Sequence, residues 1–321
     1  MEKKGFTLIE IMAVIVVLGL LIAIITPVVN NLLKDSEDTL SDEQISMIVN
    51  ASKKYMVEHS ELLPEMSDGS KTFIYIDDLI NNGVIDNDKV INPKTKEELD
   101  GCVVVNYNDS FNQYEYNYSD SPNDCLITVT FDPEGGSVEE SSKQVRYNST
   151  YGELPTPTRE GYTFKGWRGK NAFDVDKVIL KKYSSVKGDK VIIDASSVEG
   201  NVANWIESRL YNDDTFIKSF SNNSGIIEKD STFNNINIKL NTNKSDGYFA
   251  YDISFLENGQ TYKFSYILEK DYSKARVSFS NIQLEKGDTT TEFEPYQEYR
   301  SDTVVTKSSD HTLHAIWEIA S

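Results

Sequence analysis

The sequence is poor in the residues on which most metal and catalytic sites depend. Its 321 residues include only two cysteines and three histidines, too few for a cysteine zinc ribbon or an iron–sulfur cluster. The histidines, His59, His311 and His314, are scattered along the chain, and no nucleophile elbow or metal-binding motif occurs. We therefore expect no catalytic residue, no metal and no cofactor, and we expect that the chain is not an enzyme.

Positive charge is also scarce. The chain has 51 acidic and 32 basic side chains, which gives a formal net charge of −19. Such a charge opposes binding to nucleic acid or to an anionic membrane surface, because both repel a strongly acidic protein. We therefore expect no nucleic-acid partner. A chain of this length is typical of two or three domains.

The longest apolar run lies close to the N-terminus, at residues 11–29. As a helix it would extend roughly 28 Å, which is close to the thickness of a bilayer core. Lys3 and Lys4 precede it and favour a cytoplasmic start with the remainder of the chain outside. A secretory signal or a plain anchor is the simplest interpretation, but no cleavage site of the A-x-A type follows.

Glu10 does not fit that simplest interpretation. It lies between Ile9 and Ile11, at the edge of the apolar run. An ionisable side chain in such a segment costs several kcal/mol unless it is paired, so it is a candidate functional residue. Cleavage after Gly5 would supply a positive partner, the new amino terminus of Phe6.

The run from Lys3 to Glu10 and the apolar segment after it resemble the type IV prepilin signature. The resemblance implies that a prepilin peptidase cuts after Gly5 and methylates the amine of Phe6. It also implies that Glu10 pairs with that amine on a neighbouring subunit, and that Pro27 loosens the helix. The expected partners are therefore other pilin subunits, the prepilin peptidase and, before assembly, the cytoplasmic membrane.

The N-terminal helix is expected to continue past the membrane, over residues 6–60. Beyond the apolar run, one face of it carries side chains at helical spacing, which are Ile45, Ile48, Val49, Ser52 and Met56. We expect this face to pack on a small sheet. Residues 73–80 are predicted to form a short helix, and alternation at 103–107 and 114–118 predicts paired strands.

These elements predict an α+β pilin domain at residues 6–125, after a leader at 1–5. Cys102 and Cys125 bracket its predicted hairpin. An even pair outside the membrane is typical of a disulfide, which would contribute roughly 3 kcal/mol through the entropy of loop closure. Two free, buried thiols are the alternative.

A different pattern begins after Cys125. Alternating Ile127, Val129 and Phe131 predict a strand, and Val145 with Tyr147 predict a second one. With the run from Tyr151 to Trp167, they resemble the internalin-type B-repeat, a β-grasp-like module. We expect its aromatic side chains to be core residues and not a ligand platform; they are Phe131, Tyr162, Phe164 and Trp167.

The strand that would close this repeat does not follow Trp167. Alternation at Leu313, Ala315 and Trp317 supplies it near the C-terminus. We therefore predict a repeat split into residues 126–168 and 299–317, with a second domain inserted at 169–298. Loops accept such insertions when the ends of the inserted domain lie close together.

The predicted insertion contains short β-like runs separated by turn residues, which favours a β-sandwich. The runs are 190–195, 205–211, 236–240, 248–255, 261–269 and 275–284. Its last segment, residues 280–296, resembles the end of carbohydrate-binding-like jelly rolls. The candidates for ligand contact are Trp205, Tyr211, Tyr248 and Tyr251, although Trp205 as a core residue is the alternative. A glycan or another host or cell-surface ligand is the expected partner.

The fold class expected from these patterns is an α+β pilin followed by all-β modules. The expected function is that of a minor type IV pilin or pilin-like subunit, which assembles through its N-terminal helix and displays an adhesive head. Such a chain is single-pass in the cytoplasmic membrane before assembly and lies on the cell surface afterwards. A pseudopilin of a type II-like secretion or DNA-uptake machine is the alternative.

Overall fold

The computed structural model describes residues 42–320 except 68, 93–95, 195–209, 212–216, 222–223 and 241–246. The chain divides into two compact units, Met1–Leu126 and Ile127–Ser321. Strands, most of them antiparallel, dominate the described residues, in agreement with the expected β-rich fold. Within this described part of the chain, which starts at residue 42, no helix is both long and apolar enough to cross a membrane.

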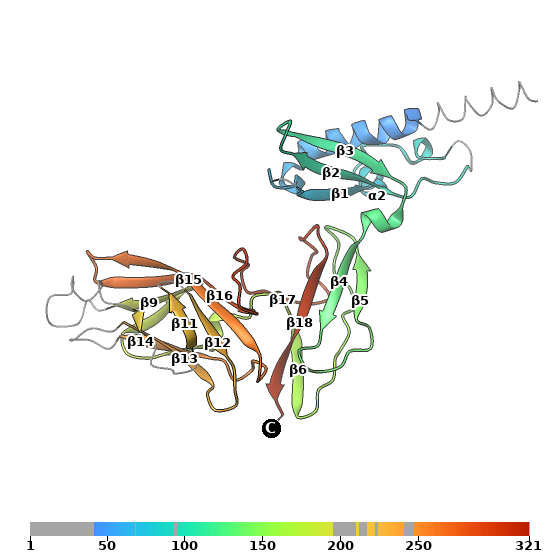
Figure 1. Ribbon diagram of the computed structural model, residues 1–321. Helices are drawn as coiled ribbons and strands as arrows, with labels where there is room; N and C mark the ends of the chain where they lie inside the picture. Colours follow the sequence, from blue (N-terminus) through green and yellow to red (C-terminus); the bar gives the residue numbers. More distant parts are fainter. Residues whose placement is uncertain are drawn as a thin grey trace, which may run out of the picture. The chain divides into compact units, whose positions relative to one another are not determined.

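The first unit packs a helix on a three-stranded antiparallel sheet. The helix covers residues 42–58 and lies along the sheet (Figure 1). The strands, in sheet order, are β1 (Lys71–Tyr75), β2 (Cys102–Asn108) and β3 (Gln113–Ser119). Ile48, Ser52 and Met56 of the helix are buried, and Ile48 and Met56 belong to the same core as Val103 of β2. The predicted apolar helix face and the predicted hairpin are therefore confirmed.

The predicted helix at residues 73–80 is wrong in its first half. Residues 73–75 belong to β1, and the helix α2 starts afterwards, at Ile76–Asn81. The run from Phe73 to Ile76 is apolar at every position and completely buried, so it has no alternation that separates a strand from a helix. Antiparallel pairing with β2, in which Ile74 lies opposite Val103, makes this run a strand. Short 3₁₀ turns complete the unit: η1 (Ser60–Leu62), η2 (Asn87–Lys89) and η3 (Pro122–Cys125).

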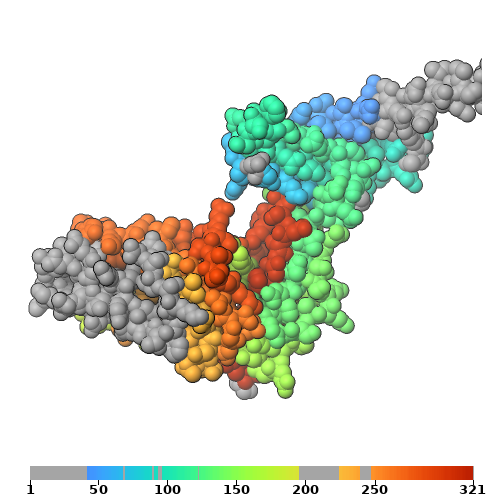
Figure 2. All heavy atoms as spheres, in the orientation of Figure 1, coloured from blue at the N-terminus to red at the C-terminus, as the bar shows by residue number. Residues whose placement is uncertain are grey.

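The second unit contains a five-stranded sheet built from two distant parts of the chain. Its strands, in sheet order, are β17 (Glu298–Tyr299), β6 (Tyr162–Arg168), β18 (His311–Ile319), β4 (Ile127–Asp132) and β5 (Ser142–Val145). The C-terminal strand β18 is antiparallel to β6 and parallel to β4. Figure 2 shows its atoms, in red, beside the green atoms of residues 127–168. The predicted late strand is therefore present, in the centre of this sheet.

Aromatic side chains of this sheet pack against one another. Phe131 and Trp167 are buried with ring centroids 5.0 Å apart, as expected of core residues. Tyr162 and Phe164 are only half-buried, although Phe164 contacts Trp167 and Trp317 edge-on. The expectation that these aromatics are core residues therefore holds for Phe131 and Trp167, and only in part for Tyr162 and Phe164, which lie in the first half of β6. Tyr147, predicted within a strand, lies just beyond β5.

The residues between these two parts form two further sheets. One has the order β10 (Leu210–Tyr211), β13 (Asn235–Leu240), β14 (Tyr248–Asp252) and β7 (Val178–Leu180). The other has the order β11 (Ile217–Ser221), β12 (Ser224–Glu228), β15 (Thr261–Asp271), β16 (Arg276–Lys286), β9 (Lys190–Asp194) and β8 (Ser184–Lys187). A 3₁₀ turn, η4 (Val175–Lys177), precedes β7.

Both of these sheets contribute to a single hydrophobic core. Ile236 and Phe249 come from the four-stranded sheet, and Phe264 and Phe279 come from the six-stranded sheet. Phe249 and Phe279 meet edge-on across the core, with ring centroids 5.2 Å apart. Two sheets that share one buried layer form a sandwich, which is the predicted class for this part of the chain.

Candidate functional site

The residues predicted for processing and assembly lie outside the described part of the chain. Gly5, Phe6, Glu10 and Pro27 all precede residue 42. The first helical residues that the structure describes are 42–58, whose buried face packs on the sheet. The roles of these four residues therefore stay predictions.

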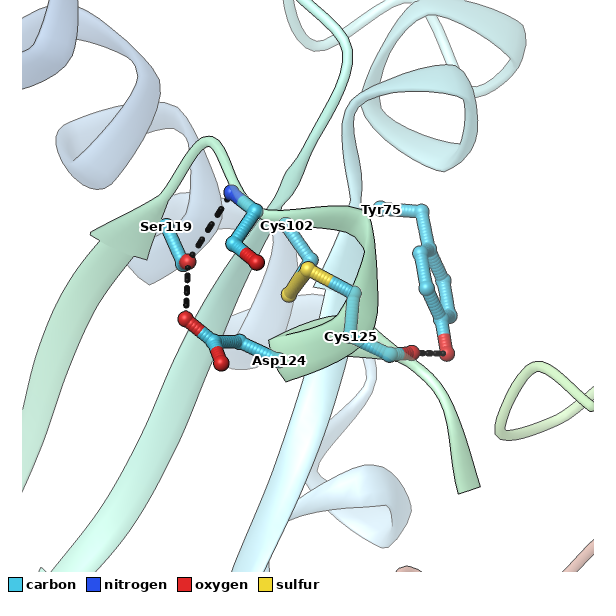
Figure 3. Close-up of a disulfide and its surroundings, with 6 residues drawn as sticks. Tyr75, Cys102, Ser119, Asp124 and Cys125 are labelled. Atoms are coloured by element: carbon cyan, nitrogen blue, oxygen red, sulfur yellow. Dashed lines mark hydrogen bonds between the residues drawn. A yellow bond between two sulfur atoms is a disulfide. The ribbon is translucent and has the colours of Figure 1, made fainter. Parts of the chain in front are cut away.

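The predicted disulfide joins Cys102 and Cys125, with the Cα atoms 5.8 Å apart (Figure 3). Cys102 is the first residue of β2, and Cys125 ends the turn η3. Both sulfurs are buried, and the Tyr75 hydroxyl donates to the Cys125 carbonyl oxygen at 2.7 Å. The disulfide therefore fixes the last residues of the first unit to its central strand, immediately before the chain enters the second unit.

Side-chain hydrogen bonds hold the same turn from the other side. The Ser119 hydroxyl donates to an Asp124 carboxylate oxygen at 2.8 Å and accepts the Ser121 N–H at 3.2 Å (Figure 3). The exit of the first unit is thus attached both to β2, covalently, and to the end of β3.

The aromatic residues predicted for ligand contact do not form one surface. Trp205 lies outside the described residues, and for Tyr211 only the backbone, in β10, is described. Tyr248 is partly exposed at the start of β14. Tyr251 is completely buried and stacks on Phe173 with ring centroids 4.3 Å apart.

Tyr251 therefore has no ring face for a ligand, and its prediction as a contact residue is corrected. Its hydroxyl donates to the Ala172 carbonyl oxygen at 3.1 Å and accepts the Asp174 N–H at 2.9 Å. Burial raises the pKa of the Tyr251 hydroxyl well above its usual value. Alternation along β14 places this side chain in the sandwich core, a position that sequence alone does not separate from the opposite face.

A buried ion network lies where the five-stranded sheet meets the sandwich. Its centre is Glu134, in the turn after β4, with its side chain 8% exposed. Arg168 of β6 and His314 of β18 approach one carboxylate oxygen, at 3.2 and 3.0 Å. Lys286 of β16 lies 3.5 Å from the other oxygen. The network therefore joins three segments of the five-stranded sheet to one strand of the sandwich.

The network shifts the pKa values of its acids and of its histidine. A hydrogen bond from His314 lowers the pKa of Asp132 to about 2. Burial alone would raise the pKa of Glu134, but the hydrogen bond from His314 and the charge of Arg168 outweigh it and lower that pKa. For His314, burial would lower the pKa, but its hydrogen bonds to Asp132 and Glu134 prevail and raise it.

Three atoms of this network could in principle hold a metal ion. One ligand atom from each of Asp132, Glu134 and His314 lies within 4.8 Å of the others. Glu134, however, already pairs with Arg168, and Lys286 is near its second oxygen. A divalent cation would be repelled by these two fixed positive charges in a poorly solvated place. We therefore regard the cluster as an ion network and not as a metal centre.

The raised pKa of His314 predicts a pH dependence of stability. A histidine whose pKa is higher in the folded state stabilises the fold below its unfolded value of 6.5, and this contribution is lost as pH rises through the folded pKa. We expect the free energy of unfolding to fall as pH rises from 6.5 through the folded pKa of His314. The expected loss is about 1 kcal/mol, the scale of one net hydrogen bond. His314→Gln should remove this decline. Denaturant unfolding followed by the fluorescence of buried Trp167 and Trp317 measures it.

His311 provides the matched control. Burial lowers its pKa, so its contribution is lost as pH falls below 6.5 and not as pH rises. His311→Gln should therefore leave the decline above pH 6.5 unchanged. If His314→Gln keeps the full decline, the assignment to His314 is wrong.

The sequence gives no signal for this network. Glu134, Arg168, Lys286 and His314 lie in four separate segments, and only the sheet order brings them together. The scattered positions of the three histidines lead us to expect no histidine-based site. That argument does not detect His314, which belongs to an ion network. The one local hint is that His314 falls between the apolar positions of its strand and is nevertheless only 17% exposed.

Comparison with protein families gives two matches. Residues 1–26 match the prokaryotic N-terminal methylation motif, and residues 128–192 match the Listeria-Bacteroides repeat domain. Both agree with the resemblances seen in the sequence, to a pilin and to a B-repeat. The second match extends past Arg168 into β7, β8 and β9, which the structure assigns to the sheets of the sandwich. No curated protein and no solved structure matches the chain.

Proposed function

We propose that this chain is a minor type IV pilin or pilin-like subunit that carries a binding head. The observation that carries the proposal is the methylation motif at residues 1–26, which implies a pilin-type precursor anchored in the membrane and later exposed on the surface. The helix at 42–58 packs on a disulfide-bonded antiparallel sheet. This arrangement supports the proposal, because a pilin subunit combines an N-terminal helix with a compact globular domain.

The size of the second unit favours a minor subunit. The described residues of the second unit form three sheets beyond the pilin-like unit. A bulky head is harder to repeat at every lattice position of a filament than a compact one. The head would therefore be displayed on few subunits. The disulfide between Cys102 and Cys125, directly before the second unit in the chain, would resist a force applied to the head. No catalytic role is part of this proposal.

The domain boundaries are part of the same proposal. We assign residues 1–5 to the leader and 6–125 to the pilin domain. Residues 126–168 and 299–317 form a split repeat, and residues 169–298 form an inserted sandwich of the jelly-roll class. Support comes from the ladder in which Trp167 pairs with Tyr299, since it places the two ends of the insertion next to each other.

A pseudopilin of a secretion or DNA-uptake machine is the second candidate. The methylation motif is equally compatible with it. A DNA-uptake role would be favoured by exposed basic clusters, and the net charge of −19 argues against that role. A large, two-sheet insertion suits a surface ligand better than a moving part of a secretion machine.

Processing gives a first test of the proposal. Gly5→Val should stop cleavage almost completely, because it replaces the glycine of the prepilin motif with a branched side chain at the expected cleavage site. The precursor would keep residues 1–5 and stay in the membrane, while the wild-type chain should begin with a methylated Phe6. Intact-mass measurement of the purified chains distinguishes the two. A wild-type chain that still begins at Met1 would contradict the proposal.

A further inference from the structure

The second unit contains a cleft between the five-stranded sheet and the sandwich. Its volume is about 430 Å³, within the range of small-ligand sites. One wall comes from β6 and β18. The other comes from η4 and the residue before it, from the end of β14 and the segment after it, and from the start of β17 and the segment before it. The cleft lies apart from the ion network around Glu134, which does not line it.

Aromatic side chains give this cleft apolar faces. Tyr162, Phe255 and Tyr296 line it, and all three are partly exposed. Trp317 also borders the cleft, but it is 4% exposed and its indole N–H donates to the Pro133 carbonyl oxygen, so it forms the floor. Partly exposed rings over a packed floor are suited to stacking against a flat, weakly apolar ligand.

Carboxylates surround these rings in fixed orientations. Asp174 and Asp252 each accept a backbone N–H on one oxygen, from Asp176 at 2.9 Å and from Ser254 at 2.8 Å. Within the described part of the chain, their second oxygens have no hydrogen-bond donor. Each carboxylate is therefore oriented by the backbone and keeps one acceptor for a ligand.

Two more residues extend this acceptor set along the cleft. The Tyr296 hydroxyl donates to a Glu298 carboxylate oxygen at 3.1 Å, which connects an aromatic face to a third acid. A carboxylate oxygen of Glu298 also lies 3.9 Å from the Arg300 guanidinium, but this ion pair is exposed and therefore weak.

Charge narrows the class of ligand. Among the described residues that line the cleft, Lys165 is paired with Glu318 at 2.6 Å, and Lys177 lies with the three other carboxylates, those of Asp174, Asp252 and Glu298. Burial is the main cause that raises the pKa of Asp174, and the nearby carboxylates of Asp176 and Glu298 add to it. An acidic ligand would be repelled, while hydroxyl and amino groups would donate to these acceptors.

We propose that this cleft binds a saccharide that carries hydroxyl or amino groups and no acidic group. The sugar rings stack on Tyr296 and Phe255, and their donors reach the carboxylates of Asp174, Asp252 and Glu298. This inference rests on the proposed role of the second unit as a binding head and names its ligand class. It places the ligand at residues other than those that sequence patterns predict.

Calorimetric titration of the full chain tests the site. The chain is held in zwitterionic detergent micelles, because sugar-based detergents would compete. The probes are tetramers of glucosamine, of N-acetylglucosamine and of galacturonic acid. We expect at least one of the first two to bind with a Kd below about 1 mM. The galacturonic acid tetramer should not bind.

Variants of cleft residues test whether the heat of binding measured by calorimetry comes from this cleft. Tyr296→Ala should weaken binding at least about tenfold, as for truncation of a central aromatic contact, while Tyr296→Phe should retain most of it. Asp252→Asn should weaken binding of the glucosamine tetramer more than that of the acetylated one. Tyr272→Ala, an exposed tyrosine (53%) of the same unit outside the cleft, is the matched control.

Several results would overturn the site. They are no heat from either non-acidic tetramer, equal or tighter binding of the acidic tetramer, or an equal loss with Tyr272→Ala and Tyr296→Ala. If Tyr296→Ala does not fold, Asp252→Asn still decides, since unchanged binding in that variant contradicts the model of acceptor carboxylates. The assay needs no filament, so its failure leaves the pilin proposal standing, and failed filament incorporation leaves the cleft standing.

Discussion

Glu10→Ala should be processed normally and yet be almost absent from filaments, with at least a tenfold loss relative to wild type, on the order of the several kcal/mol that an ionisable group costs in an apolar segment. The physical reason is the position of Glu10, a single carboxylate at the start of the apolar run. If it pairs with the Phe6 amine of a neighbour, the charged pair is satisfied only in the assembled filament. Removing the carboxylate leaves the neighbour's amine buried without a partner.

Quantitative immunoblots of sheared filaments and of membranes measure this effect. Glu10→Asp should recover part of the incorporation, since it keeps the charge on a shorter side chain. Glu37→Ala is the control for lost negative charge, because Glu37 lies beyond the apolar run. Equal incorporation of Glu10→Ala and wild type would exclude the pairing.

Replacing residues 169–297 with four Gly/Ser residues should leave the five-stranded sheet folded. Arg168 and Glu298 are register partners in the β6–β17 ladder, so a tight turn can join them. Loop-closure entropy grows only logarithmically with loop length, so the shorter connection is not itself unfavourable. We expect a loss of about 1 kcal/mol, because Glu134 gives up its partly exposed neighbour Lys286.

Removal of residues 299–320 is the opposing control. It deletes β18, which lies between β6 and β4, and so separates the sheet into two parts. This variant should have no cooperative transition for the repeat. Thermal unfolding followed by tryptophan fluorescence compares both variants with wild type. If the linker variant is also unfolded, the repeat and the sandwich are a single folding unit and the boundaries at 168 and 299 are wrong.

Sequence patterns predict the alternating strands of this protein well. The faces of β4, β15 and β18 follow from period-two alternation, and in β15 the buried Tyr262, Phe264 and Tyr266 alternate with less buried residues. The pairing of β18 with β6 across the insertion is predicted by resemblance to a repeat, since no local signal connects residues so far apart.

Other features depend on tertiary context and are therefore missed. Residues 73–76 are buried at every position, so periodicity cannot tell strand from helix there. The side of β14 on which Tyr251 lies depends on register, and a shift of one residue would reverse it. The ion network and the cleft each combine segments from two sheets that meet only in the folded unit.

The central claim is that this chain is a subunit of a surface filament with its second unit displayed. Immunogold microscopy of native filaments, with antibody raised against residues 169–298, tests it most directly. We predict sparse labelling on filaments, at the tip or at intervals, that is lost in the Gly5→Val strain. Labelling confined to the cell envelope, with filaments unlabelled in wild type, would contradict the claim and favour the pseudopilin alternative.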